Sequence, residues 1–299
     1  MASPTPAVYA AGPSIRRRPT LARRLAPGDV AAWLVLAVAI VVALFPFFWV
    51  LRTAVTPTPE AFSLRPTLLP TNYTAEHLIR VIVSPTLPFG RYFLNSVIVS
   101  LGTTAMVLVA GSWGAYALAR LEFKGRQAFG ISLLLIQLFP AVLLVIPLFV
   151  VFAQVGLVNN LLGLIVAYTT FNLPFVVWLL RGYFLSIPRE LEDAARIDGC
   201  SYLGVLFRVV LPMAAPGLAA VATLAFVNSW NEFFFAYVFI NDDTKRVLAI
   251  GLSAYIDQFR TDYTGLFAMA TLTTLPVVVV FVIFQRYLVG GLTAGAVKA

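Results

Sequence analysis

Asn228-Ser229-Trp230-Asn231-Glu232 is the most polar group of residues inside any long apolar stretch of this sequence. Polar side chains at membrane depth are costly, so they usually face a cavity or a partner helix. Amides and a carboxylate beside an aromatic ring suit the hydroxyls and flat faces of sugars. The alternative is an interfacial belt at the outer end of a helix. Asn228, Trp230, Asn231 and Glu232 are therefore candidate residues of a substrate pathway.

Catalytic and metal chemistry find no support in the sequence. The chain has one histidine, His77, and one cysteine, Cys200, so neither an internal disulfide nor a Cys–His metal site can form. A Walker A loop needs Gly-Lys followed by Ser or Thr, and no lysine of this chain follows a glycine. We predict no catalytic residue, no metal and no cofactor on this chain. We expect His77 to be a solvated surface residue.

Long apolar segments must position the polar residues. The 299-residue chain is 60% hydrophobic and 11% charged, far from the composition of soluble domains, which predicts an all-α integral membrane protein. Apolar runs of about 20 residues, long enough to cross a bilayer, occur six times. We place the six spans at 31–51, 93–119, 127–153, 162–181, 217–240 and 265–288. Pro140, Pro147 and Pro174 interrupt the third and fourth spans, where we expect kinks rather than breaks.

The basic residues predict the orientation of these spans. With the N-terminus in the cytoplasm, the inner segments carry the whole net charge of +8, as the positive-inside rule expects, so the charge does not call for nucleic acid. Both termini then lie inside. Residues 1–30 form a disordered basic tail, and residues 31–90 form the first span and an outer loop. That loop has one helical candidate, Thr74 to Val83, and either contacts a substrate-delivery protein or only covers helix ends.

The inner loop from Tyr183 to Gly217 has the signals of two short helices. Pro188 and the acidic residues that follow suit a helix start, and Gly199 can adopt the left-handed conformation that ends a helix. Ser201 can cap a second helix, which we expect Pro212 to end. Such a pair of helices either lies among the lipid headgroups as an amphipathic segment or is bound by another protein.

The spacing of residues in this loop favours the second alternative. Asp193-Ala194-Ala195, three residues, Gly199, nine residues, Val209, one residue and Leu211-Pro212 resemble the "EAA" loop of ABC importer permeases. Asp193 and Val209 stand where that family usually has Glu and Ile, and the neighbouring Glu192 offers the longer side chain. The resemblance implies a type I importer permease with its core at 91–290 and a cytoplasmic coupling loop at 183–217. The residues implied in ATPase coupling are Glu192, Asp193, Ala194, Ala195, Asp198, Gly199, Leu211 and Pro212.

The last residues narrow the resemblance. Gly291-Leu292-Thr293-Ala294-Gly295-Ala296-Val297-Lys298 is similar to the tail of maltose-type carbohydrate permeases, with Ala299 in place of a final glycine. Without that resemblance, the segment would be predicted to be a flexible C-terminus. The resemblance implies that a cytoplasmic tail, residues 291–299, enters the ATPase interface through Gly291, Thr293, Gly295 and Lys298.

The resemblance implies the permease of an ATP-driven importer of maltose, maltodextrin, trehalose or a similar oligosaccharide in a bacterial or archaeal cytoplasmic membrane. The implied partners are a second homologous permease, two copies of a P-loop ATPase that holds ATP and Mg, and an extracytoplasmic sugar-binding protein. Three alternatives remain: an ion-coupled carrier or channel, a permease for a non-sugar solute such as a glycerol-phosphate ester, and a membrane scaffold. Ionisable residues are scarce within the spans, with Glu232 near one end and Arg181 at a boundary, which disfavours ion coupling.

Overall fold

The computed structural model describes residues 27–256 and 261–296, with side chains for residues 30–256 and 261–287. Most of the predicted basic tail, residues 1–26, lies outside the described residues. Within them every named element is a helix, which confirms the all-α prediction, and one isolated β-bridge joins Ile256 to Thr261. The elements are α1 Pro27–Ala54, α2 Thr58–Ala61, α3 Glu76–Ile82, α4 Phe89–Arg120, α5 Arg126–Gln137, η1 Ala141–Leu144, α6 Val145–Gln154, α7 Leu161–Ser186, α8 Arg189–Ile197, α9 Tyr202–Val205, η2 Leu206–Val210, α10 Leu211–Met213, α11 Ala215–Asn231, α12 Phe234–Phe239, η3 Asp243–Lys245, α13 Leu248–Ser253 and α14 Tyr263–Ala296.

Among the described residues, four helices are long and apolar enough to cross a membrane, and they agree in approximate position with the predicted first, second, fourth and sixth spans. Two bent pairs of shorter helices raise the count to six if each pair is one span. The first pair coincides with the predicted third span, whereas the second, Tyr202–Met213 with Ala215–Asn231, begins inside the predicted inner loop. The chain divides into two units, Met1–Phe48 and Trp49–Ala299. Within the first unit, α1 has apolar side chains all round, as a lipid-facing span requires.

Two predicted spans are broken where the sequence suggested continuity. The third bends by 93° between α5 and η1, so the kink expected at Pro140 is a break. Pro140 lacks an N–H group and precedes η1 in an extended conformation, which ends the α-helical ladder there. Pro174, by contrast, lies inside an unbroken α7. The fifth predicted span, 217–240, also breaks between Asn231 and Phe234, where the Glu232 carboxylate accepts hydrogen bonds from the backbone N–H groups of Phe235 and Ala236.

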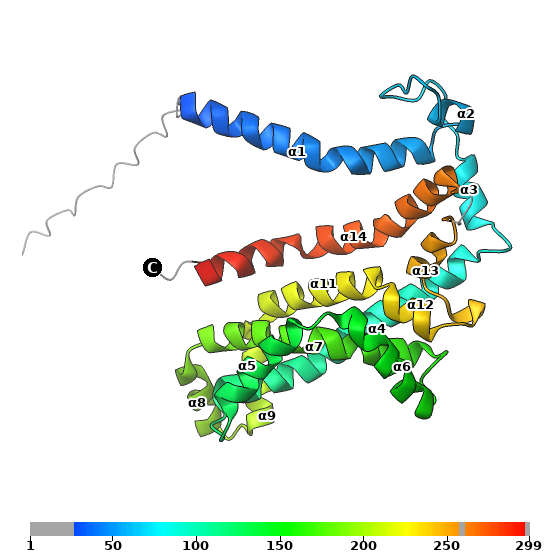
Figure 1. The fold of residues 1–299 in the computed structure, drawn as a ribbon. Helices are drawn as coiled ribbons and strands as arrows, with labels where there is room; N and C mark the ends of the chain where they lie inside the picture. The colour runs from blue at the N-terminus through cyan, green and yellow to red at the C-terminus, as the bar shows by residue number, and fades with distance from the viewer. Residues whose placement is uncertain (1–26, 257–260, 297–299) are drawn as a thin grey trace, which may run out of the picture. The chain divides into compact units, whose positions relative to one another are not determined.

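The helices of the second unit pack closely around α4 and α7. Helix α7 runs along α4, and α11 contacts α4, α7 and α14 (Figure 1). Small residues permit this approach: a Cβ atom at Gly111 of α4 would lie 2.6 Å from a methyl carbon of Val176 in α7. Buried side chains of α4, α7, α9 and α11 then form one continuous core, which reaches the predicted inner loop.

The prediction that His77 is solvated is wrong. Helix α3, found within the predicted 74–83 segment, packs against α14 and buries the His77 side chain. Its Nε2 donates a hydrogen bond to the backbone carbonyl of Thr56 at 3.1 Å. An ion pair of 2.9 Å between Arg80 and Asp262 also joins α3 to the residues before α14. The predicted outer loop is therefore packed against α14. These contacts join segments that are far apart in the sequence, so the local sequence could not predict them.

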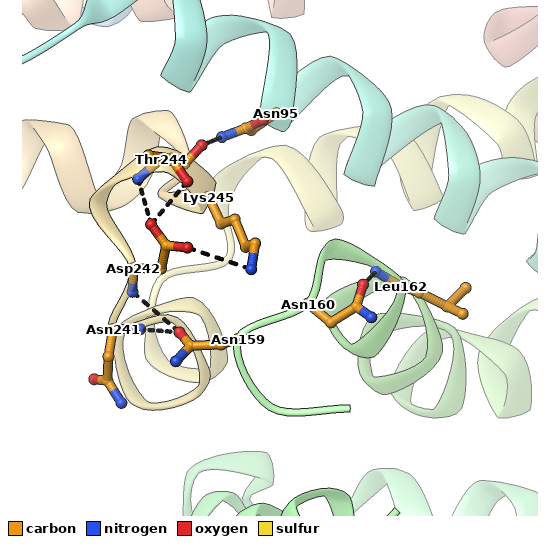
Figure 2. Close-up of polar contacts among 8 residues, drawn as sticks. All are labelled: Asn95, Asn159, Asn160, Leu162, Asn241, Asp242, Thr244 and Lys245. Atoms are coloured by element: carbon orange, nitrogen blue, oxygen red, sulfur yellow. Dashed lines mark hydrogen bonds and ion pairs between the residues drawn. The ribbon is translucent and has the colours of Figure 1, made fainter. Parts of the chain in front are cut away.

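Asparagine side chains tie together three segments (Figure 2) at the end of the second unit opposite α8 and α9 (Figure 1). Asn159, in the turn before α7, adopts a left-handed conformation with φ of 56°. Its Oδ1 accepts hydrogen bonds from the backbone N–H groups of Asn241 and Asp242, at 2.6 and 3.0 Å. In α4, Asn95 donates through Nδ2 to the carbonyls of Thr244 and Arg246, at 3.0 and 2.9 Å. We call these contacts of Asn95 and Asn159 the outer clasp.

Candidate functional sites

The predicted helix–turn–helix of the inner loop is present as α8 and α9. Glu190 and Glu192 occupy the first turn of α8, where they complement the helix dipole. Gly199 has φ of +87°, the left-handed conformation that the sequence predicted for it. The Ser201 hydroxyl accepts a hydrogen bond from the backbone N–H of Gly204, so the predicted cap also holds. The predicted end of the second helix at Pro212 holds to within one residue: the helical path ends at Met213 and bends by 81° at Ala214.

A buried ion pair fixes α8 to the core. Glu192 is 6% exposed, and its carboxylate accepts hydrogen bonds from Arg120 Nε at 2.5 Å and the Tyr116 hydroxyl at 3.3 Å. The same guanidinium donates to the carbonyls of Phe184 and Ile187, at 2.7 and 2.8 Å, where α7 ends. Arg120 therefore connects the last turn of α4, the end of α7 and the first turn of α8. The Glu192 carboxylate is therefore directed into the core of this chain.

The rest of α8 and α9 presents an exposed face. Among the residues predicted for coupling, Asp193, Ala194, Asp198, Gly199 and Pro212 are exposed, whereas Ala195 and Leu211 pack against the core. Ile197 beside them is 86% exposed. A shallow hollow follows the turn between the helices and is lined by Asp193, Arg196, Ile197, Gly199, Cys200 and Ser201. Sequence patterns identified this turn but not Arg120 or Tyr116, which lie more than seventy residues earlier.

A second site is a polar pocket of about 200 Å³ between α7, α11 and α12, near the break before α6. Asn228 Nδ2 donates to Asn172 Oδ1 at 3.1 Å. The buried Tyr168 hydroxyl lines the same pocket as the Glu232 carboxylate and has no hydrogen-bond partner among the described residues. The rings of Phe171 and Phe235 lie 4.8 Å apart. The residues that line the pocket are Ala141, Tyr168, Phe171, Asn172, Asn228, Ser229, Glu232 and Phe235.

The predicted substrate-pathway residues are only partly brought together. Asn228 and Glu232 line the polar pocket, but Trp230 is buried elsewhere, where its Nε1 donates to the Thr273 carbonyl at 3.1 Å and its ring packs on Phe226. Asn231 is exposed and bonds the carbonyl of Val227 in its own helix. Adjacent helical residues point about 100° apart, so five consecutive residues cannot share one face. Tyr168 and Asn172 were missed, although their i, i+4 spacing in α7 is a recognisable signal.

The predicted C-terminal tail is partly described. Helix α14 continues to Ala296, so Gly291, Thr293 and Gly295 are helical. Lys298 lies outside the described residues.

Comparison with known proteins identifies the family. Residues 108–293 match the family described as "Binding-protein-dependent transport system inner membrane component". The chain belongs to this family. The chain is 38% identical over 263 residues to the inner membrane ABC transporter permease protein YcjP of Escherichia coli K12, covering 88% of this chain and 94% of that protein. It is 35% identical over 259 residues to the trehalose/maltose transport system permease MalG of Thermococcus litoralis, covering 86% and 92%.

Solved structures agree with this assignment. A chain of a bacterial ABC transporter that imports the acidic polysaccharide alginate superposes with a TM-score of 0.75 at 25% identity, covering 90% of this chain and 99% of that one. The protein is thus a multi-pass ABC importer permease with the type I fold. It is a transport subunit, and ATP hydrolysis belongs to a separate subunit of the transporter.

Proposed function

We propose that this permease imports an oligosaccharide that an extracytoplasmic binding protein delivers. The observation that carries the substrate class is the polar pocket, in which two amides, a hydroxyl and a carboxylate meet two aromatic rings. Relatives named for trehalose/maltose and a structural neighbour that imports alginate support a saccharide. A volume of about 200 Å³ suits one sugar ring, being below the roughly 300–1,000 Å³ of pockets for larger ligands. A second permease then supplies the remaining contacts.

A glycerol-phosphate ester is the less favoured solute. Its phosphate would approach the Glu232 carboxylate in a pocket that has no lysine or arginine among its lining residues. Like charges placed together at low dielectric are costly, whereas sugar hydroxyls can donate to a carboxylate.

We further propose that the exposed face of α8 is the contact with an ATPase, which holds the ATP and Mg, in an assembly of two permeases and two ATPases in the cytoplasmic membrane. Ala194 is small and exposed, so a partner groove can approach the helix backbone closely. Closure of the ATPases around ATP would displace α8 and favour one of two permease states. The partner supplies the free-energy difference between those states.

Reconstitution of the complex in proteoliposomes with its binding protein tests this function. We expect uptake of a labelled disaccharide or oligosaccharide that requires ATP and the binding protein, with no response to an ion gradient. Uptake driven by a proton or sodium gradient without ATP would identify an ion-coupled carrier. Purification of the chain without a P-loop ATPase or a second permease, in mild detergent and good yield, would favour a scaffold.

Removal of the pocket amides should weaken transport. We expect Asn172→Leu or Asn228→Leu to lower the uptake rate at subsaturating sugar about tenfold, since each leaves substrate hydroxyls without a hydrogen-bond partner. Asn231→Leu is the matched control, because this amide lies on the same helix as Asn228 but outside the pocket. Equal uptake by all three variants would remove the pocket from the substrate pathway while leaving the import function untouched.

A further inference from the structure

A groove of about 700 Å³ opens between the start of α5, the turn after α4 and the last turns of α7. The start of α5 and the end of α7, which border it, lie at the same end of the second unit as α8 and α9 (Figure 1). The residues that line it are Leu118, Phe123, Gly125, Arg126, Gln127, Ala128, Gly130, Ile131, Leu133, Leu134, Trp178 and Arg181. None of the roles proposed above for the permease uses this groove.

Two unpaired cations face the groove. Arg126 and Arg181 are both half-buried, and neither forms an ion pair with any residue that the structure describes. Each makes one long hydrogen bond to a backbone carbonyl: Arg181 Nε to Leu118 at 3.3 Å, and Arg126 to Leu121 at 3.4 Å. Glu122, the nearest acidic residue in sequence, is exposed and does not line the groove. Partial burial of unpaired guanidinium groups is costly, so the arrangement favours an anion between them.

The remaining walls are apolar and aromatic. Trp178 and Phe123 are partly exposed at the groove, and Ile131 and Leu134 extend it along α5. Trp178 precedes the end of α7 at Ser186 by eight residues, which is about 12 Å of helix. Tryptophan at that depth from a helix end is typical of the boundary between headgroups and acyl chains. The positive-inside distribution of charge places this end in the cytoplasmic leaflet, whose lipids carry negative charge.

We propose that the groove binds one anionic phospholipid of the cytoplasmic leaflet. Its phosphate lies between Arg126 and Arg181, and an acyl chain follows Trp178 and Ile131 along α5. Cations at the aqueous end and apolar side chains toward the membrane interior match the two halves of a phospholipid, whereas an acidic protein segment would match only the first. Because Arg181 contacts the end of α4 two residues before Arg120, the lipid would also steady the helices that hold α8.

Native mass spectrometry of the intact complex, purified in mild detergent from membranes rich in phosphatidylglycerol, tests the proposal. The complex should retain phosphatidylglycerol, and the double variant Arg126→Gln/Arg181→Gln should lose at least nine-tenths of it. Arg189→Gln is the matched control, since Arg189 is an exposed arginine at the same end but outside the groove. Arg126→Lys/Arg181→Lys keeps the charge and should keep most of the lipid.

A second readout separates lipid loss from misfolding. In nanodiscs of phosphatidylcholine, adding phosphatidylglycerol should raise the unfolding temperature of the native complex and leave that of the double glutamine variant unchanged. Equal retention of phosphatidylglycerol by native and variant complexes would overturn the proposal. So would equal retention of a zwitterionic lipid, or a cross-link from the groove to an acidic segment of another subunit with no lipid retained. None of these outcomes depends on which solute the permease carries.

Discussion

Replacing Arg120 with methionine should abolish ATP-driven uptake and release α8 from the core. Arg120 and Glu192 have side chains only 7% and 8% exposed, so the variant leaves a carboxylate buried without its partner. Removing one member of a buried pair costs about 3–5 kcal/mol. The variant also frees the carbonyls of Phe184 and Ile187 at the end of α7. Co-purification of the ATPase, together with uptake in proteoliposomes, measures the effect.

A double variant distinguishes the ion pair from a general loss of packing. Arg120→Met/Glu192→Gln removes the unpaired charge and should recover part of the ATPase binding that Arg120→Met loses. Arg91→Met, an exposed arginine at the opposite end of the same helix, should behave as the native chain. If Arg120→Met alone retains full coupled uptake, the ion pair does not position α8.

Valine in place of Gly199 should lower binding-protein-stimulated ATP hydrolysis and uptake together. At φ of +87°, no heavy atom lies within 4 Å of the Cβ position, so the cost is backbone strain rather than a clash. That strain is about 1–2 kcal/mol for an L-residue and larger for a β-branched one. It tilts α9 relative to α8, and we expect binding-protein-stimulated ATP hydrolysis and uptake to fall about tenfold while the chain still inserts into the membrane.

Two further variants make the Gly199 result specific. Gly199→Asn should retain most activity, because asparagine tolerates the left-handed conformation. Gly182→Val places the same side chain in open space at the end of α7, without a positive φ, and should have little effect. Equal loss of activity in the asparagine and valine variants would point to a need for a bare backbone at the partner surface instead of a turn.

Local signals predicted the parts of the molecule that local physics determines. Gly199 and Ser201 are found in their predicted roles because a left-handed turn and a cap depend on neighbouring residues. Glu192 could not be assigned as a buried partner of Arg120, because that contact joins residues 72 positions apart. His77 was misjudged for a similar reason, since its burial depends on the Thr56 carbonyl, 21 positions earlier, and on the packing of α3 against α14.

The position of the polar pocket was predictable only in part. A run of polar residues in an apolar stretch indicated Asn228 and Glu232, but helical geometry sends Trp230 to another face. The helix breaks beside Glu232, whose carboxylate accepts a hydrogen bond from α12, but no proline or glycine marks this break in the sequence. At Pro140 the sequence did indicate a kink, but it did not predict that the helix would break with a bend of 93°.

The outer clasp is a fixed attachment about which α4 and α7 can tilt. Asn95 and Asn159 hold the outer ends of α4 and α7 to the same loop, while Arg120 binds their inner ends to α8. Helix α7 has 26 residues, so the lever arm between the two attachments is about 39 Å. A displacement of α8 by about 5 Å would rotate α7 by only about 7° about the outer clasp, because α7 is long at a rise of about 1.5 Å per residue. We therefore expect a small displacement of α8 to tilt α4 and α7 about the outer clasp while the contacts of the clasp are kept.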